Sequence, residues 1–335
     1  MTESPLIFRA MLLAFGAGLC CLAVWSISVG SANLSLGQVI GALGTPDSET
    51  REALIIWSVR LPRVLAAIVV GASLATAGAI MQAATGNPLA DPGLLGVNAG
   101  AALAVVVLLV IFGNGLAANL LIWAALVGAF AAAATVYGMG AMGRSGPTPV
   151  KLVLAGVVVA TFLGVLTASL LILDSQTLDA VRQWTAGSLR GKALQDVMAV
   201  APYMLGGLAV AFALRNQFTA LSLGGDVAQG LGQNPTKWRL ISALIVVLLA
   251  GGAVAIAGPI GFVGLVVPHM ARLVVGADYR RILPLAMLGG AFLTLLADVL
   301  PRALWRNDVP VGVSLALVGA PFFIWLARGR LGPGT

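Results

Sequence analysis

Few side chains in this sequence could perform catalysis or bind a metal ion. The only histidine is His269, and the only two cysteines, Cys20 and Cys21, are neighbours within one apolar run. Neighbouring cysteines in such a run indicate neither a disulfide framework nor a metal site. We therefore expect no catalytic residues and no bound metal ion in this chain.

One segment approaches a nucleotide-binding motif without matching it. Gly187 to Ala193 reads GSLRGKA, which can be compared with the phosphate-binding loop GxxxxGK[ST]. It has one residue too few between its glycines, and Ala193 stands where the motif needs a hydroxyl side chain for magnesium. We predict that the chain is not an enzyme and that any ATP hydrolysis belongs to a partner.

The composition determines the kind of element that must position these residues. Of 335 residues, 59% are hydrophobic and only 9% are charged, whereas soluble domains carry about 25% charged residues. A polar shell around a core of this size cannot be made, so the sequence predicts an integral membrane protein. The net charge is +7, but the basic residues are scattered through the connections, which argues against nucleic-acid binding.

Ten apolar runs are candidates for membrane helices, which need roughly 20 apolar residues each. The first run has no small-residue cleavage site after it, which favours a retained helix over a signal peptide. The run at 262–275 is short enough to be tilted or partly re-entrant. We predict an all-α integral membrane protein with one transmembrane domain, residues 1–335. The runs are 8–29, 64–84, 94–112, 116–138, 152–173, 197–214, 240–257, 262–275, 283–300 and 310–327.

The charged residues between the runs give the expected orientation. If the N-terminus is cytoplasmic, ten spans place the C-terminus there too. Inside connections then hold eleven Lys and Arg residues and outside connections hold eight, a weak excess in the direction of the positive-inside rule. The outer face keeps more arginine than insertion favours, so we predict that some of it serves a partner.

Two segments of the chain echo each other. Gly71–Met81 reads GASLATAGAIM and Gly251–Gly261 reads GGAVAIAGPIG, with five identities at an offset of 180 residues. In the expected topology they run in opposite directions, and such an inverted repeat is typical of transporters. The first leads into GNPLADPG, which we interpret as a sharp inner turn capped by Asp91.

Three long stretches carry a resemblance to a known family. They are RLPRVLAAIVVGASLATAGAIMQAATGNPLADPGLLGVNAGAAL, GPIGFVGLVVPHMARLVVGADYRRILP and LPRALWRNDVPVGVSLALVGAPFFIWL. In this order, and over about residues 55–327, they closely resemble the permease family of bacterial ABC importers for ferric siderophores, haem and cobalamin. The resemblance implies the type II importer permease fold in the bacterial cytoplasmic (inner) membrane.

The resemblance also implies a set of partners. It implies a second permease chain, identical or related, two cytoplasmic ATPase subunits that bind ATP and magnesium, and a soluble binding protein that docks outside. This chain would bind no cofactor itself. Arg60, Arg63 and Arg302 correspond to arginines that grip acidic residues of the binding protein, since guanidinium groups match carboxylates. The alternative role for them is anchoring of helix ends at the membrane surface.

Two further groups of residues take their roles from the resemblance. The connection Leu221–Leu240 corresponds to the cytoplasmic coupling segment that seats in the ATPase. The cytoplasmic gate corresponds to Thr148, Pro149 and Val150, and the last two replace small hydroxyl residues of some relatives, which leaves the gate chemistry open. The expected coupling residues are Leu223, Gly224, Asp226, Val227, Leu231 and Gly232.

The predicted function is passage of a ferric siderophore from the binding protein into the cytoplasm by alternating access. Haem or cobalamin is the alternative cargo within the family. An ion-coupled secondary transporter is the alternative from another class. It would need paired carboxylates inside the spans, and the sequence has no such pair near the middle of any run.

The segment Leu173–Lys192 is more similar to siderophore members than to haem or cobalamin members. In it, Arg182 and Arg190, with Lys192, could attract an anionic ferric chelate at the entrance. They could equally be paired with acidic residues of this chain. Those acids are Asp174, Asp179 and Asp196.

Two buried-looking polar residues have simpler explanations. His269 could contact haem or carry a proton, but VPH belongs to the framework of the family, which favours a structural role. Asp298 lies near the outer end of a span, and intramembrane acids are candidates for function. Here Arg302, four residues further on, is the expected partner of its carboxylate.

Overall fold

The structure is a computed structural model, and every regular element in its described part is helical. It describes residues 5–30, 34–45, 50–113, 115–142, 147–173, 178, 181–182, 184–305 and 308–329. The long helices are α1 (Pro5–Ser28), α4 (Leu61–Thr85), α5 (Val97–Phe112), α6 (Ala118–Ala141), α7 (Pro149–Leu173), α9 (Leu194–Ala213), α12 (Pro235–Ala257), α13 (Val263–Val275), α14 (Tyr279–Leu304) and α15 (Val311–Gly329). Short elements are α2 (Leu36–Leu43), α3 (Arg51–Ile55), the π-helical turn η1 (Ile56–Arg60), the 3₁₀ turn η2 (Pro92–Leu95), α10 (Arg215–Ser222) and α11 (Gly225–Gly230).

The ten apolar runs correspond one to one with the ten long helices of the described chain. Seven of these helices are long and apolar enough to cross a membrane. Helices α5 and α13, and the part of α15 from Val311 to Phe322, are apolar but shorter. With 13 residues, α13 is about 20 Å long, well short of a hydrocarbon core of about 30 Å. The prediction of an all-helical membrane fold is confirmed.

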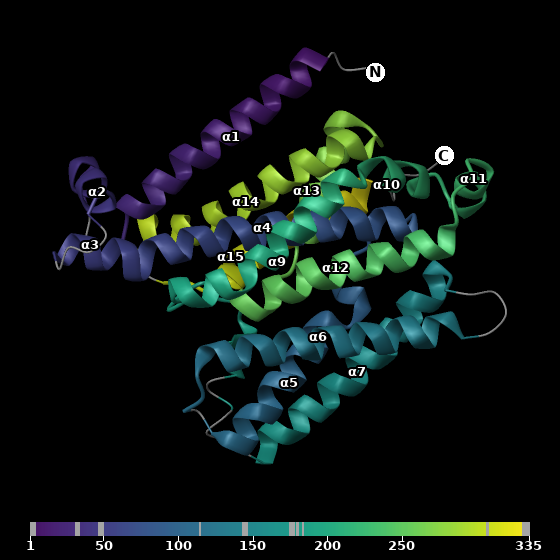
Figure 1. The fold of residues 1–335 in the computed structure, drawn as a ribbon, viewed down its shortest axis with the longest axis horizontal. Helices are drawn as coiled ribbons and strands as arrows, with labels where there is room; N and C mark the ends of the chain where they lie inside the picture. The colour runs from purple at the N-terminus through teal and green to yellow at the C-terminus, as the bar shows by residue number, and fades with distance from the viewer. Residues whose placement is uncertain are drawn as a thin grey trace.

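Helices α4 and α12 form the centre of the bundle. Nineteen residues of α4 are buried, because α14, α13, α12 and α9 all pack against it. Helices α5, α6 and α7 form a group on the far side of α12, while α1 lies along α14 (Figure 1). The chain marks for N and C lie at the end of the bundle that carries α11, and η1, α2 and α3 lie at the opposite end (Figure 1). We call these the α11 end and the η1 end.

The helix pairs follow the predicted inverted repeat. Helix α4 packs against α14, and its counterpart α12 packs against α6; in the same way α5 pairs with α6, and α13 with α14. The echoed glycines face these partners, since Gly71 lies against Gly290 of α14 and Gly251 against Ala129 of α6. Helix α4 runs toward the α11 end, and α12 starts there and runs back (Figure 1). The two echo segments are therefore antiparallel, as expected.

Glycines let the central helices touch through their backbones. A Cβ atom at Gly78 would lie 1.8 Å from the carbonyl oxygen of Gly264, and one at Gly71 would lie 2.2 Å from that of Gly290. Lipid offers no hydrophobic drive for helix pairing, so close van der Waals packing at small residues supplies it. The glycine-rich composition is therefore used at particular helix crossings.

The break after α4 is a packed turn, as the sequence predicted. Gly86 ends α4 in the left-handed region with φ +64°, and Gly96 begins α5 with φ +74°. Between them Asp91 caps η2, its Oδ1 accepting the N–H of Gly93 at 2.8 Å. Burial raises the pKa of Asp91, and the hydrogen bond from Gly93 opposes that rise. The capping role of Asp91 is confirmed.

We predict that Gly78→Ala destabilises the protein, because the new methyl group would overlap the backbone of α13. Overpacking of this kind costs about 1–3 kcal/mol. Thermal unfolding of the purified protein in detergent measures the effect. Gly206→Ala in α9 is the matched control, since nothing lies within 4 Å of a Cβ there. Equal unfolding temperatures for the two variants would contradict the backbone contact.

Candidate functional site

A buried carboxylate binds two arginines at the η1 end. Arg63 lies in the first turn of α4, and Arg302 follows Asp298 by one turn on α14. Arg63 Nε donates to the two Asp298 oxygens at 3.0 and 3.1 Å, and its Nη2 lies 2.9 Å from Oδ1. Arg302 Nη2 lies 2.7 Å from Oδ2. Asp298 is only 1% exposed, so its charge is neutralised inside the protein, and Arg302 is its partner as expected.

Arginines of this end also hold the last turn of α1. Arg302 Nη2 donates to Ser26 Oγ at 2.8 Å, and Arg60 Nη1 donates to the carbonyl oxygens of Ile27 and Ser28. The last carbonyls of a helix have no intrahelical N–H partner, and these guanidinium groups supply donors. The ends of α1, α4 and α14 are thereby joined.

The three arginines predicted to dock a partner therefore lie together, but they are buried. Their exposed fractions are 5% for Arg60, 7% for Arg63 and 8% for Arg302. Within the chain they fix helix ends, which is the alternative that the sequence left open, and docking stays a prediction. Arg63 also reaches toward the surface, because its Nη1 lies 2.8 Å from Oδ1 of the exposed residue Asp308.

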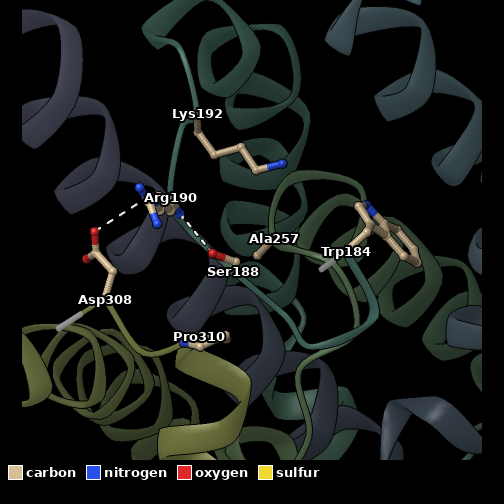
Figure 2. Close-up of a pocket in the computed structure, with 7 residues that line it drawn as sticks. All are labelled: Trp184, Ser188, Arg190, Lys192, Ala257, Asp308 and Pro310. Carbon is tan, nitrogen blue, oxygen red and sulfur yellow. Dashed lines mark hydrogen bonds and ion pairs between the residues drawn. The ribbon is translucent and has the colours of Figure 1, made fainter. Parts of the chain in front are cut away.

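A polar cavity of about 630 Å³ opens beside Asp308 (Figure 2). It lies where the segment before α9 passes between the ends of α12 and α15, since Ser188 N–H donates to the Ala257 carbonyl and Gly312 N–H to that of Gly187. Arg190 extends toward Asp308, with 3.6 Å between its Nε and Oδ2. The lining residues are Trp184, Ser188, Arg190, Lys192, Ala257, Asp308 and Pro310.

The cavity gives different outcomes for the two predicted entrance arginines. Arg190 lines it, whereas Arg182 is exposed and lies outside the lining set. The acid beside Arg190 is Asp308, which differs from the three acids weighed from the sequence. Of those, Asp174 and Asp179 lie outside the described residues.

Lys192 on the cavity wall is affected by the remaining acid, Asp196. Burial lowers the pKa of Lys192, and the nearby carboxylate of Asp196 counteracts that effect. Asp196 also accepts the N–H of Ala193 at 3.3 Å, which starts α9. Of the three acids weighed from the sequence, Asp196 therefore influences Lys192 through its charge, while Arg190 lies beside Asp308.

The predicted gate residues lie at the α11 end. Pro149 begins α7 and Val150 is 78% exposed, while Arg239 of α12 donates to the Pro147 carbonyl at 3.2 Å. Pro149 and Val150 line an apolar cavity of about 480 Å³, and the preceding Thr148 is half-buried. The other lining residues are Thr85, Asn87, Val153, Leu154 and Val157.

The predicted coupling segment forms short helices whose apolar residues face outward. Leu223, Val227 and Leu231 are 54%, 50% and 62% exposed. Gly224 before α11 and Gly232 after it have φ +102° and φ +81°, which only glycine adopts readily. The glycines bracket α11, which carries Val227, and the exposed Leu223 and Leu231 flank this helix. Asp226, in the first turn of α11, is exposed beside them.

His269 packs inside the bundle. It is 4% exposed on α13, and its ring meets that of Phe322 edge-on, with 6.5 Å between the ring centroids. In the described part of the chain, no group of three or more His, Cys, Asp or Glu side chains could hold a metal ion. The ring packing supports the structural role expected for His269.

Sequence reasoning missed Asp308 and Ser26. Asp308 lies within the stretch LPRALWRNDVPVG, whose arginine was singled out, so an acid six residues beyond Arg302 was the available signal. Its partner Arg63 is 245 residues away, and no local pattern indicates such a pair. Ser26 lies in an apolar run where nothing marks it as a hydrogen-bond acceptor.

A helical membrane bundle with charge at one end and exposed apolar helices at the other fits a transport permease. The chain belongs to the FecCD transport family, whose model matches residues 18–329. It is 45% identical over 304 residues to the "Probable siderophore transport system permease protein" of Bacillus subtilis, covering 90% of this chain and 91% of that protein.

Other relatives and a solved structure are also transport permeases or ABC transporters. The Fe(3+)-citrate import system permease protein of Bacillus subtilis is 42% identical over 323 residues, covering 96% of this chain and 93% of that protein. The hemin transport system permease protein of Yersinia pestis is 39% identical over 314 residues, 91% of each chain. A metal-chelate type ABC transporter in an inward-facing conformation superposes with a TM-score of 0.84 at 28% identity, over 96% of this chain and 99% of that one. The predicted class, an ABC importer permease in the membrane, is confirmed.

We predict that Asp298→Asn strongly destabilises the protein, because it removes the buried counter-charge that Arg63 and Arg302 share, and leaves Arg63 with the surface acid Asp308 alone. Breaking a buried ion pair costs about 3–5 kcal/mol. Denaturant unfolding monitored by tryptophan fluorescence measures the loss. Asp226→Asn removes the same charge from an exposed site on α11 and should change stability little. A small effect at Asp298 would mean that the arginines are neutralised in another way.

Proposed function

We propose that this chain is the translocation subunit of an ATP-driven importer that receives a ferric siderophore and passes it into the cytoplasm. The exposed apolar row of Leu223, Val227 and Leu231, on and beside α11, carries the proposal. Three large apolar side chains, exposed beside polar residues at the end of a membrane bundle, favour a groove in a partner protein. The proposed partner is the cytoplasmic ATPase pair, which would bind ATP and magnesium, while this chain binds no cofactor.

This assignment orients the chain in the membrane. The α11 end is then cytoplasmic, together with both termini, and the η1 end faces the soluble binding protein. Arg60, Arg63 and Arg302 are proposed to form the docking surface at that end, with a second permease chain completing the pathway. Closure of the ATPases would move α11, and the bundle would open to one side at a time.

The proposed gate is an apolar constriction at the cytoplasmic end. Thr148, Pro149 and Val150 lie beside the apolar cavity between the end of α4 and the start of α7. Hydrophobic constrictions block passage by excluding water. A gate of this kind would not need the small hydroxyl residues of some relatives.

The cavity at the η1 end favours an anionic cargo. Arg190 and Lys192 project from one segment onto its wall, opposite the single acid Asp308 (Figure 2). A ferric chelate travels with its own ligands, so a basic wall suffices to attract it. Relatives named for iron chelates support ferric siderophore, and haem or cobalamin is the alternative cargo. An ion-coupled transporter is less favoured, because the buried acid Asp298 is already held by two arginines.

The cargo can be identified by its effect on ATP hydrolysis. We expect ferric siderophore, and not haem or cobalamin, to stimulate ATP hydrolysis by the reconstituted permease, ATPase and binding protein. The measurement is phosphate release in nanodiscs with each cargo in turn. Stimulation by haem or cobalamin alone would show that the cargo is the alternative one and not a ferric siderophore. Uptake by this chain alone, driven by an ion gradient, would overturn the proposal.

The exposed apolar row can be tested by its effect on association with the ATPase. Val227→Glu places a charge in the exposed apolar row, and we expect it to weaken association with the ATPase by about tenfold or more, since buried apolar anchors dominate interfaces. Co-purification and binding in detergent measure this. Gln229→Glu adds the same charge to another exposed position of α11 and should leave association close to normal. Equal loss in both variants would argue for a general charge effect.

A further inference from the structure

The guanidinium group of Arg63 binds a buried carboxylate through two of its nitrogens and a carboxylate at the surface through the third. Its Nε and Nη2 bind Asp298, which is buried. Its Nη1 binds Oδ1 of Asp308 at 2.8 Å, and the Asp308 side chain is 34% exposed. Removal of Asp308 would therefore present Nη1 to the outside without disturbing the buried ion pair.

Arg302 differs from Arg63 in this respect. Its Nε donates to the Asp298 carbonyl oxygen at 3.1 Å, its Nη1 to the Val29 carbonyl at 3.4 Å, and its Nη2 to Asp298 and Ser26. Each nitrogen of this guanidinium is directed at an acceptor of the helix ends. An external carboxylate can reach Arg63 by replacing one surface acid, whereas at Arg302 it would have to displace the framework.

Asp308 also connects Arg63 to the cavity. Its second oxygen, Oδ2, lies 3.6 Å from Nε of Arg190, whose side chain is 72% exposed. The carboxylate thus lies between a buried cation and a cation of the cavity wall (Figure 2). A carboxylate from a partner that took its place at Arg63 would leave Asp308 with Arg190 as its remaining cation.

We propose that Asp308 is an internal competitor for docking: it occupies Arg63 in the undocked chain and is replaced there by a carboxylate of the soluble binding protein. This inference rests on the proposed function. It commits to an acidic partner, because Nη1 of Arg63 is a donor that already holds a carboxylate.

The test is the affinity of the binding protein for the permease–ATPase complex in nanodiscs, measured by biolayer interferometry. Asp308→Asn keeps the shape of the side chain and removes its charge. We expect docking to become about two- to fivefold tighter, the range for loss of one competing, partly exposed ion pair. Glu52→Gln, in the first turn of α3 at the same end, removes the same charge without touching Arg63 and should change docking less.

A second pair of variants separates this inference from docking itself. Arg63→Gln removes the cation, while Asp298 keeps Arg302 as its buried counter-charge. If Arg63→Gln weakens docking while Asp308→Asn leaves it unchanged or weaker, Arg63 docks the partner but Asp308 does not compete. If the folded Arg63→Gln variant docks normally, the docking role of Arg63 fails as well. Tighter docking with Asp308→Asn, lost again when Arg63→Gln is added, supports the competition.

Discussion

The carboxylate of Asp298, shared between Arg63 and Arg302, is the interaction on which the η1 end of this protein depends. Burial of a charge costs several kcal/mol unless a partner and further hydrogen bonds compensate it. One buried carboxylate cannot neutralise two guanidinium groups by itself. The remaining donors of the two guanidinium groups bind Ser26, main-chain carbonyls and Asp308. The same contacts that compensate the buried charges therefore also fix the positions of the helix ends.

Backbone contacts at glycine give the centre of the bundle its rigidity. Where Gly71 meets Gly290 and Gly78 meets Gly264, no side chain separates the helices, and packed contacts of this kind shift between discrete arrangements more readily than they deform. A movement imposed at α11 would then pass along α12 and α4 as motion of whole helices. This is the physical requirement for an importer in which ATP hydrolysis at one end changes access at the other.

The two ends differ in the chemistry that they offer to a partner. At the α11 end, Gly224 and Gly232 have positive φ angles and bracket a short helix, and the apolar side chains on and beside this helix are exposed. At the η1 end, arginines are buried and one acid at the surface, Asp308, pairs with Arg63. Apolar burial would support a lasting contact with the proposed ATPase, whereas charge pairs at the surface favour fast and reversible docking. The FecCD family membership and this asymmetry agree with each other.

The sequence by itself determined the helices, their breaks and the apolar spacing of the proposed coupling residues. Apolar runs, proline and glycine act locally, so the ten long helices, the cap at Asp91 and the spacing of Leu223, Val227 and Leu231 could all be predicted. Long motifs also identified the family. The inverted repeat could be inferred from five identities, because the same small residues are needed at equivalent helix crossings.

Only the tertiary structure decided which charges meet. Arg63 and Asp298 are 235 residues apart, and the sequence offered Arg302 as the neighbour of Asp298 without indicating that Arg63 shares it. In the same way, Arg190 was weighed against three acids of its own segment, and the fold placed Asp308 beside it. Charge pairing acts through space with no sequence period, so it depends on which helix ends the packing of the bundle brings together.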